Sequence, residues 1–298
     1  MEEKPTPKQQ LPYPFNQDLS DVLRHLNRRT VFGRKGLAND PVTAAYLAAA
    51  MRLVSQHLGP VSELEETETA NGEEIDRSLL GFLSQRTVAA EVAHNPDPFV
   101  RLGSVPTMRS TWKSQSDFIA DLLSFAFWPG YYPESYQEVR AVGAERLANG
   151  PDLAAAIEDL AYRVAAALDE MVSFRLQLIA IASAERHEVV RQALTDKYHR
   201  AKALWRQVYG EFLEARGLRL RPGITLDQLT DILTAMVEGT TLRGIGDPAA
   251  GVLDRVEHRS LIGTAALALL HGCLQPVESS DHRSVAQAVQ DMADRSGG

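Results

Sequence analysis

The sequence has few of the features that mark a secreted, cysteine-ligated or membrane-spanning protein. A single cysteine, Cys273, excludes an internal disulfide and a zinc site built from cysteines. No apolar run reaches the roughly 18 residues that a membrane-spanning helix needs, and the N-terminal MEEKPTPKQQLPYPF lacks the apolar segment of a secretory signal. We therefore expect a cytoplasmic protein that does not contact membranes.

The motifs of the common catalytic centres are also missing. The chain contains no Gly-x-Ser-x-Gly nucleophile turn, no phosphate-binding Gly-Lys-Ser/Thr loop and no His-Glu-x-x-His zinc pair. The histidines and glutamates between residues 185 and 199 have no recognised metal-ligand spacing, so exposed helical side chains are the simpler interpretation. We expect no enzymatic activity, no metal site and no cofactor.

The charges are unevenly distributed along the chain. The net charge of −8 argues against a surface that coats nucleic acid as a whole. Residues 63–76 carry seven acids and no base, whereas LRHLNRRTVFGRK contains no acid and five bases: Arg24, Arg28, Arg29, Arg34 and Lys35. One part of the N-terminal region is thus suited to face phosphate, and the other would be repelled by it.

Apolar residues recur at helical spacing along most of the chain, and no strand alternation of useful length occurs. The predicted helices cover residues 18–29, 42–59, 78–93, 105–112, 118–126, 151–184, 188–217, 225–244 and 259–274. Gly33 and Gly36 are expected to break the pattern after the first of these, and Thr225 to cap its helix without a full capping box. Trp112 and Cys273 are expected to be buried. The predicted fold class is all-α.

Interruptions of the helical pattern and changes in composition predict four regions. Residues 1–40 form a basic arm with a short helix, whose first 17 residues are expected to be mobile or loosely docked. A helical domain covers 41–128 and contains an acidic insertion at 60–78, expected as an exposed loop. The Gly-, Pro- and Tyr-rich stretch 128–136 marks the boundary to a second helical domain, 129–276, and a polar tail covers 277–298.

The stretches YLAAAMRLVSQHLG, RTVAAEVA and ITLDQLTDILTAMVEGTTLRG follow one another in this order. Together they resemble helices of the tetracycline-repressor-like (TetR) family of transcriptional regulators. YLAAAMRLVSQHLG is similar to that family's first helix, and RTVAAEVA to its second, through Thr87, Val88, Val92 and Ala93. The recognition helix and the start of the next helix are matched by Gly103, Val105, Thr107, Met108, Arg109, Trp112, Ser114, Gln115 and Phe118. ITLDQLTDILTAMVEGTTLRG resembles the penultimate helix of the C-terminal domain. This chain differs in its acidic insertion, in the longer turn HNPDPFVRL, and in Arg109 and Gln115, where the family usually has Tyr and Lys.

The resemblance implies a three-helix, helix-turn-helix domain that binds operator DNA as a transcriptional repressor or activator. Its recognition helix would line the major groove with Thr107, Arg109, Ser110 and Thr111. Arg101 and Lys113 would contact the phosphate backbone of the DNA. The basic stretch would enter the minor groove with Arg28, Arg29, Arg34 and Lys35. A solvated surface is the alternative role both for Arg109 and for this basic stretch.

The resemblance also implies that the C-terminal helices form a homodimer and bind a small-molecule effector. The dimer would use the helices around 225–239 and 258–274, where the small residues Gly263, Thr264, Ala265 and Ala266 permit close approach. Candidate effector-binding residues are Phe174, Leu178, Trp205, Tyr209 and Met236, for which ordinary core packing is the alternative. A TetR-fold protein that has lost DNA binding and acts as a helical interaction module is the alternative function, favoured by the acidic insertion and the changes at Arg109 and Gln115.

Overall fold

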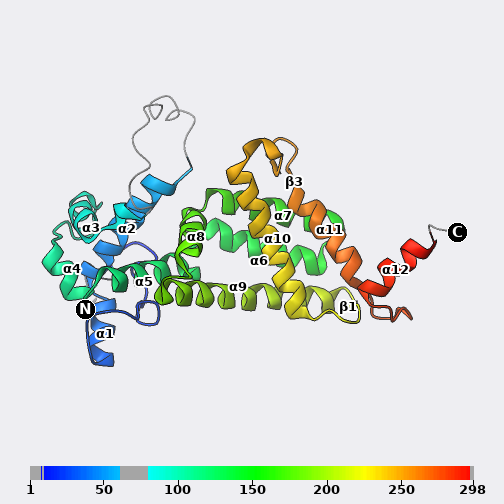
Figure 1. Cartoon of the computed structure of the whole chain (residues 1–298), viewed down its shortest axis with the longest axis horizontal. Helices are drawn as coiled ribbons and strands as arrows, with labels where there is room; N and C mark the ends of the chain where they lie inside the picture. The colour runs from blue at the N-terminus through cyan, green and yellow to red at the C-terminus, as the bar shows by residue number, and fades with distance from the viewer. Residues whose placement is uncertain (1–7, 9, 61–79, 296–298) are drawn as a thin grey trace, which may run out of the picture. The chain divides into compact units, whose positions relative to one another are not determined.

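The computed structural model describes residues 8, 10–60 and 80–295, and most of these residues are helical (Figure 1). Twelve α-helices are present in the described part of the chain, which confirms the predicted all-α class. Four very short strands were not predicted: β1 (Leu218–Leu220) pairs antiparallel with β4 (Leu274–Pro276), and β2 (Leu253–Asp254) with β3 (Arg259–Ser260). None of the described helices combines the length and apolar content needed to cross a bilayer.

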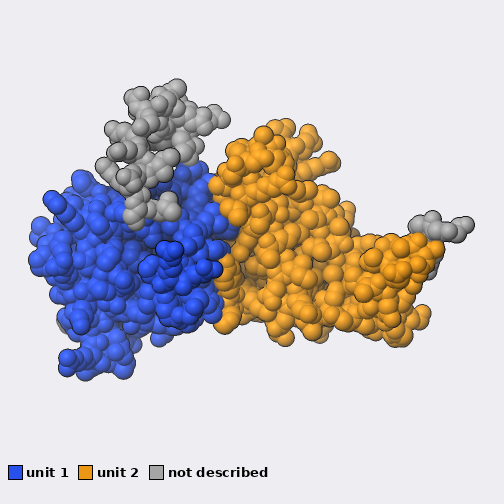
Figure 2. Space-filling view, in the orientation of Figure 1, with its two compact units in different colours: residues 1–132, 171–197 blue, residues 133–170, 198–298 orange. Residues whose placement is uncertain are grey.

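The chain divides into two compact units (Figure 2). The first consists of residues 1–132 and 171–197, and the second of residues 133–170 and 198–298. The apolar run expected as one long helix is divided at Met171 into α7 (Leu153–Glu170) and α8 (Val172–Ser183), which join different units. Helix α9 (Glu188–Ala215) supplies residues to both units.

Helix α2 (Pro41–Leu58) is the centre of the first unit and corresponds to the helix predicted over 42–59. Asp40 caps it by accepting from the backbone N–H of Val42, and Pro41 occupies the first turn, where its missing N–H costs nothing. Because α1, α3, α5 and α8 all pack around it, the residues from Thr43 to Met51 are all buried. Alanines on several faces of α2 allow these neighbours to approach closely.

Three short helices follow in the same unit: α3 (Gln85–Glu91), α4 (Val105–Thr111) and α5 (Gln115–Ala126). Each begins at a serine whose hydroxyl accepts from a backbone N–H of the first turn: Ser84, Ser104 and Ser114. The helix predicted over 78–93 is shorter than expected, because 3₁₀ turns occupy Gly81–Leu83 and Val92–His94. The acidic insertion, apart from residue 60, lies outside the described residues.

The helix predicted over 18–29 is absent, and α1 (Val31–Ala38) lies instead where Gly33 and Gly36 were expected to break the pattern. Of the four apolar residues at helical spacing in this stretch, Leu19, Leu23 and Leu26 are nevertheless buried and Val22 is half-buried. Their backbone is irregular because its N–H groups bond to side chains elsewhere, notably those of Arg24 and His25 to Asp121. Of the segment before it, residues 10–17 are docked on the first unit: Leu11 and Phe15 are buried, and the rings of Phe15 and Phe99 meet edge to face at 4.9 Å.

The second unit is built around α7, which packs against α6 (Glu134–Asn149), α10 (Leu226–Gly246) and α11 (Leu261–Cys273). Its core contains Leu160, Val164, Phe212, Leu229, Leu233, Ala266 and Cys273. Cys273 is buried as predicted. Gly263 permits the close contact of α11 with α7, because a Cβ at this position would lie 3.3 Å from Glu158 Cα.

One local expectation for the second unit was wrong, and one helix was not predicted. A full capping box begins α10, since Thr225 accepts from the backbone N–H of Gln228 and the Gln228 side chain accepts from that of Thr225. The expected polar tail contains a further helix, α12 (Val285–Arg295). An arginine–aspartate network precedes it, in which Arg283 and Arg221 both pair with Asp281 at 2.9 Å.

Candidate nucleic-acid interface

Helix α4 is fixed on α2 at its N-cap residue, Ser104. Tyr46 of α2 is fully buried, and its hydroxyl donates to the carbonyl of Ser104 at 2.9 Å while accepting from the Ser104 N–H at 3.0 Å. The Ser104 hydroxyl in turn accepts from the N–H of Thr107. The N-terminus of α4 is therefore held by both a tertiary contact and a local cap.

Helix α4 has a buried inner face and an exposed outer face. Met108, Thr111 and Trp112 are 0%, 2% and 0% exposed, whereas Thr107, Arg109 and Ser110 are exposed. We call these three exposed residues the α4 outer face. The burial of Trp112 was predicted. The expected groove contact of Thr111 is wrong, because Thr111 lies on the inner face and its hydroxyl donates back to the carbonyl of Thr107 at 3.4 Å.

Side chains of neighbouring elements join α3 and α4 into a helix pair. Arg109 Nε donates to Gln85 Oε1 at 3.2 Å, so the guanidinium crosses from α4 to the first turn of α3. Gln115, at the start of α5, donates from Nε2 to the carbonyl of Leu83 at 2.6 Å. Arg109 therefore links α4 to α3, and Gln115 links α5 to the 3₁₀ turn that precedes α3, while α3 also packs against α2.

The connection between α3 and α4, although long, is held by the buried amide of Asn95. Its Nδ2 donates to the carbonyls of Ala45 at 3.1 Å and Val100 at 3.0 Å, and its Oδ1 accepts from Arg52 at 2.7 Å. Arg101 Nε donates to the Asn95 carbonyl at 2.8 Å. Arg101, which was predicted to contact the DNA backbone, therefore braces this connection. Its guanidinium also pairs with exposed Asp97 at 3.2 Å.

The N-terminal segment bonds to the other end of α4. The Asn27 N–H donates to the Thr111 carbonyl at 2.8 Å, the Asn27 side chain to the Arg109 carbonyl at 3.3 Å, and the Arg28 guanidinium to the Ser110 carbonyl at 3.2 Å. These carbonyls belong to the last turn of α4 and have no partner within the helix. The basic stretch is therefore attached to α4 and does not hang free.

The carboxylate of Asp121, on α5, joins the N-terminal segment to the residue that ends α4. It is fully buried and accepts from the Trp112 indole N–H at 2.9 Å and from the backbone N–H groups of Arg24 at 2.8 Å and His25 at 3.0 Å. Burial raises the pKa of Asp121 to about 6, although the bonds from Trp112, His25 and Arg24 act in the opposite direction. A sequence signal for it existed: Asp121 falls on the apolar face that Phe118, Leu122 and Phe125 define.

The surface around α4 is rich in cations. Residues 98–116 contain Arg101, Arg109 and Lys113 and no acid. Arg28, Arg29, Lys35 and Lys113 are exposed and Arg34 is half-buried; Lys35 lies 3.5 Å from Asp18. Within the described residues no carboxylate pairs with Arg29, Arg109 or Lys113. Among the cations predicted to bind DNA, Arg29 and Lys113 are therefore exposed and have no carboxylate partner in this part of the chain, whereas the guanidinium groups of Arg28, Arg101 and Arg109 already bond to groups of the first unit.

The residues predicted to bind an effector are divided between the two units. Phe174 and Leu178 lie on α8 in the first unit. Trp205, Tyr209 and Met236 pack at the margin of the second unit's core, where the rings of Trp205 and Tyr209 stack with centroids 5.8 Å apart. Burial also raises the pKa of the Tyr209 hydroxyl. The five residues therefore do not line one site within a single unit.

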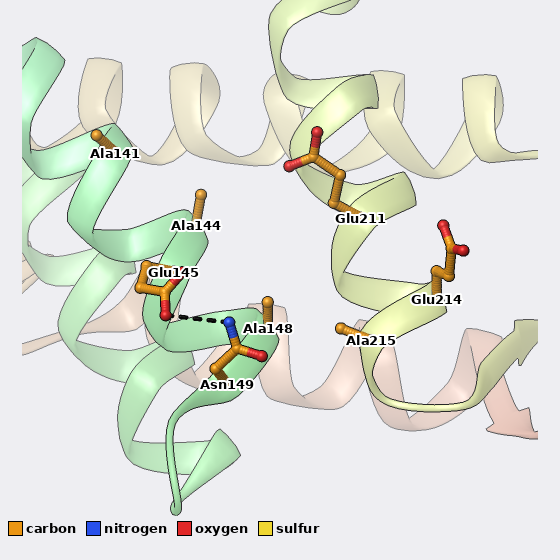
Figure 3. A pocket seen from close by; sticks show the side chains of 8 residues that line it. All are labelled: Ala141, Ala144, Glu145, Ala148, Asn149, Glu211, Glu214 and Ala215. Carbon is orange, nitrogen blue, oxygen red and sulfur yellow. Dashed lines mark hydrogen bonds between the residues drawn. The ribbon is translucent and has the colours of Figure 1, made fainter.

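A hollow of about 520 Å³ in the second unit is lined by other residues, from α6 and α9 (Figure 3). Its lining consists of four alanines, Asn149 and three glutamates: Glu145, Glu211 and Glu214. The carboxylates of Glu145 and Glu211 accept hydrogen bonds from Asn149 and Gln207 of their own helices. In the described part of the chain no group of three or more His, Cys, Asp or Glu residues is arranged to hold a metal ion.

Gly263 and Ala266, expected at a dimer interface, face α7 of the same chain and are buried. Their assignment to a dimer contact is therefore wrong, whereas Thr264 on the same helix is exposed. No protein-family model, curated protein or solved structure matches this chain.

Proposed function

We propose that this protein is a TetR-like transcriptional regulator that binds operator DNA through α4. The observation that carries the proposal is the α4 outer face: a short helix with two hydroxyls and a guanidinium exposed, on a support fixed at both ends. A reading helix needs a polar outer side and a rigid attachment, since base contacts depend on position. The exposed side chains of Thr107, Arg109 and Ser110 provide the polar side. The contacts of Tyr46, Asn95 and Asp121 support the rigid attachment.

In this proposal the α4 outer face enters the major groove. The Arg109 guanidinium is suited to bond the O6 and N7 atoms of a guanine, the commonest specific contact, while Thr107 and Ser110 supply hydroxyls that pair with several bases. Lys113 and the cations near the last turn of α4 contact phosphates, which position the protein without reading sequence. The net charge of −8 does not by itself oppose this contact, because salt screens charges that lie beyond about 10 Å.

The remaining parts of the proposal concern the second unit. A helix-turn-helix protein commonly binds two half-sites as a dimer, and α10 and α11 carry exposed apolar side chains that suit such a contact: Ile232 (43%), Leu242 (47%) and Leu261 (48%). Trp205, Tyr209 and Met236 are the candidates for contact with a small apolar effector. Sedimentation of the wild type against a Leu261→Asp variant tests the dimer, which should dissociate in the variant.

The decisive experiment asks whether the purified protein enriches particular duplexes from a random-sequence DNA library. We expect enrichment, binding that weakens steeply with salt, and loss of sequence preference in Arg109→Ala. Arg259→Ala is the matched control, because it removes an exposed arginine from the second unit. If the folded wild type enriches nothing and binds no duplex at low salt, the proposal is wrong and the interaction-module alternative remains.

A further inference from the structure

Helix α1 begins with two apolar side chains that the protein leaves in solvent. Val31 is 75% exposed and Phe32 is 87% exposed, the highest value among the large hydrophobic side chains of the described residues. Phenylalanine is usually buried, and its exposure forfeits the free energy that burial of its ring would give. The next apolar residues of α1 face inward, since Leu37 is half-buried and Ala38 is buried. The exposed tip therefore consists of Val31 and Phe32 alone.

Cations flank this tip on both sides in the sequence. Arg28 and Arg29 precede it, Arg34 and Lys35 follow it, and residues 22–37 contain no acid. An aromatic ring among four cations is complementary to a polyanion that offers apolar surface between its charges. Stacked bases between two phosphate backbones provide that combination.

The tip is held at a defined place beside α4. Asn27 and Arg28 bond to the carbonyls of the last turn of α4. The turn that follows is closed by the Thr30 hydroxyl, which accepts from the Gly33 N–H at 3.1 Å, and by Arg34, which donates to the carbonyl of Arg29 at 3.4 Å. Figure 1 shows α1 and α4 at the same end of the first unit. The tip thus has a rigid link to the end of the proposed reading helix.

We infer that Phe32, assisted by Val31, is an apolar wedge that enters the minor groove next to α4 and partly unstacks one base step. The inference rests on the proposed function, because it places the wedge by reference to α4 in the major groove. Minor-groove proteins insert Phe, Leu, Ile or Met between base steps and kink the duplex, with neighbouring cations on the phosphates. A lipid surface fits less well, because adsorption to a bilayer needs an apolar helix face much larger than two side chains.

The test uses a duplex enriched by the wild-type protein, with 2-aminopurine placed in turn at each step flanking the protected site. We expect binding of the wild type to raise fluorescence at one step, as the base unstacks. Phe32→Ala abolishes this signal and weakens binding about tenfold, while the salt dependence stays unchanged because no phosphate contact is lost. Phe32→Leu retains most of the signal. Val256→Ala, which truncates an 85% exposed apolar residue of the second unit, changes neither quantity.

Two outcomes would contradict the proposed insertion of Phe32, and they can be told apart. If Phe32→Ala binds the duplex as tightly as the wild type and gives the same fluorescence, the wedge is wrong while DNA binding stands. If the folded wild type binds no duplex, the proposed function fails and the wedge fails with it. In that case, Phe32-dependent binding to vesicles of phosphatidylserine and phosphatidylcholine assigns the tip to a membrane surface instead.

Discussion

The indole N–H of Trp112 donates to the carboxylate of Asp121 at 2.9 Å, and both side chains are fully buried. Trp112 is the C-cap residue of α4 and Asp121 lies on α5, so this bond joins the two helices. The same carboxylate accepts from the backbone of residues 24 and 25. A single acidic group thus connects the N-terminal segment, the proposed reading helix and the helix that follows it.

Removal of this carboxylate should destabilise the first unit strongly. Asp121→Ala leaves the Trp112 indole and the N–H groups of Arg24 and His25 without their acceptor, and each unsatisfied buried donor costs about 1–3 kcal/mol. We expect a loss of about 3 kcal/mol or more in the free energy of unfolding, measured in urea. Asp21→Ala, at an exposed aspartate of the same segment, serves as the control and should change it little.

Asp121 should also make stability depend on pH. Its pKa is about 6 in the folded chain against 3.8 for the free group, so the folded state binds the proton more tightly. The proton bound to Asp121 therefore stabilises the folded state. This contribution to the free energy of unfolding is complete below about pH 4 and is lost as the pH rises to about 6, a change of about 3 kcal/mol. The measurement is the difference in free energy of unfolding between the wild type and Asp121→Asn across this pH range. A constant difference would contradict the assignment.

The Asn95 amide should control the rigidity of the connection before α4. Asn95→Ala removes the bonds to the carbonyls of Ala45 and Val100 and to the Arg52 guanidinium. We expect faster hydrogen exchange in residues 96–104 and a loss of about 2 kcal/mol in the free energy of unfolding. Asn149→Ala on α6, which breaks one exposed bond to Glu145, should show neither effect. Unchanged exchange in Asn95→Ala would mean that the connection is held by other contacts.

Lys113 and Arg109 should differ in what their loss does to DNA binding. Lys113→Ala removes a phosphate contact, so it should weaken binding to all duplexes alike and reduce the salt slope by about one. Arg109→Ala should relax base preference at one position of the site. Titrations of one enriched duplex and its single-base variants, at several salt concentrations, separate the two. Equal loss of preference in both variants would contradict the division of roles.

The helices that sequence reasoning found are those whose signals are local. The helix predicted over 42–59 has an apolar pattern, an aspartate cap and a terminal glycine, and α2 agrees with it to within a residue. Residues 18–29 show the same leucine spacing but form no helix. Their backbone donors bond to Asp121, about a hundred residues away in the chain, and no local pattern reveals a partner at that distance.

The candidate site was predictable to the same extent. The family resemblance placed Thr107, Arg109 and Ser110 on the outer side of α4, where they are exposed, but it placed Thr111 there as well, and Thr111 is buried. The sequence pattern did not predict that Asn27 and Asn95 hold the two ends of α4 and the connection before it. In the sequence alone, an asparagine that bonds to distant backbone groups cannot be distinguished from an asparagine on the surface. Apolar spacing likewise could not assign Phe174 and Trp205 to different units.

The contact of Asn27 and Arg28 with the last turn of α4 has an electrostatic consequence. The final carbonyls of a helix carry the negative end of its dipole, which repels a phosphate backbone brought near it. Here three of those carbonyls accept from an amide N–H, an asparagine side chain and a guanidinium. The end of α4 that would oppose a polyanion therefore carries a positive charge, supplied by a residue from the beginning of the chain.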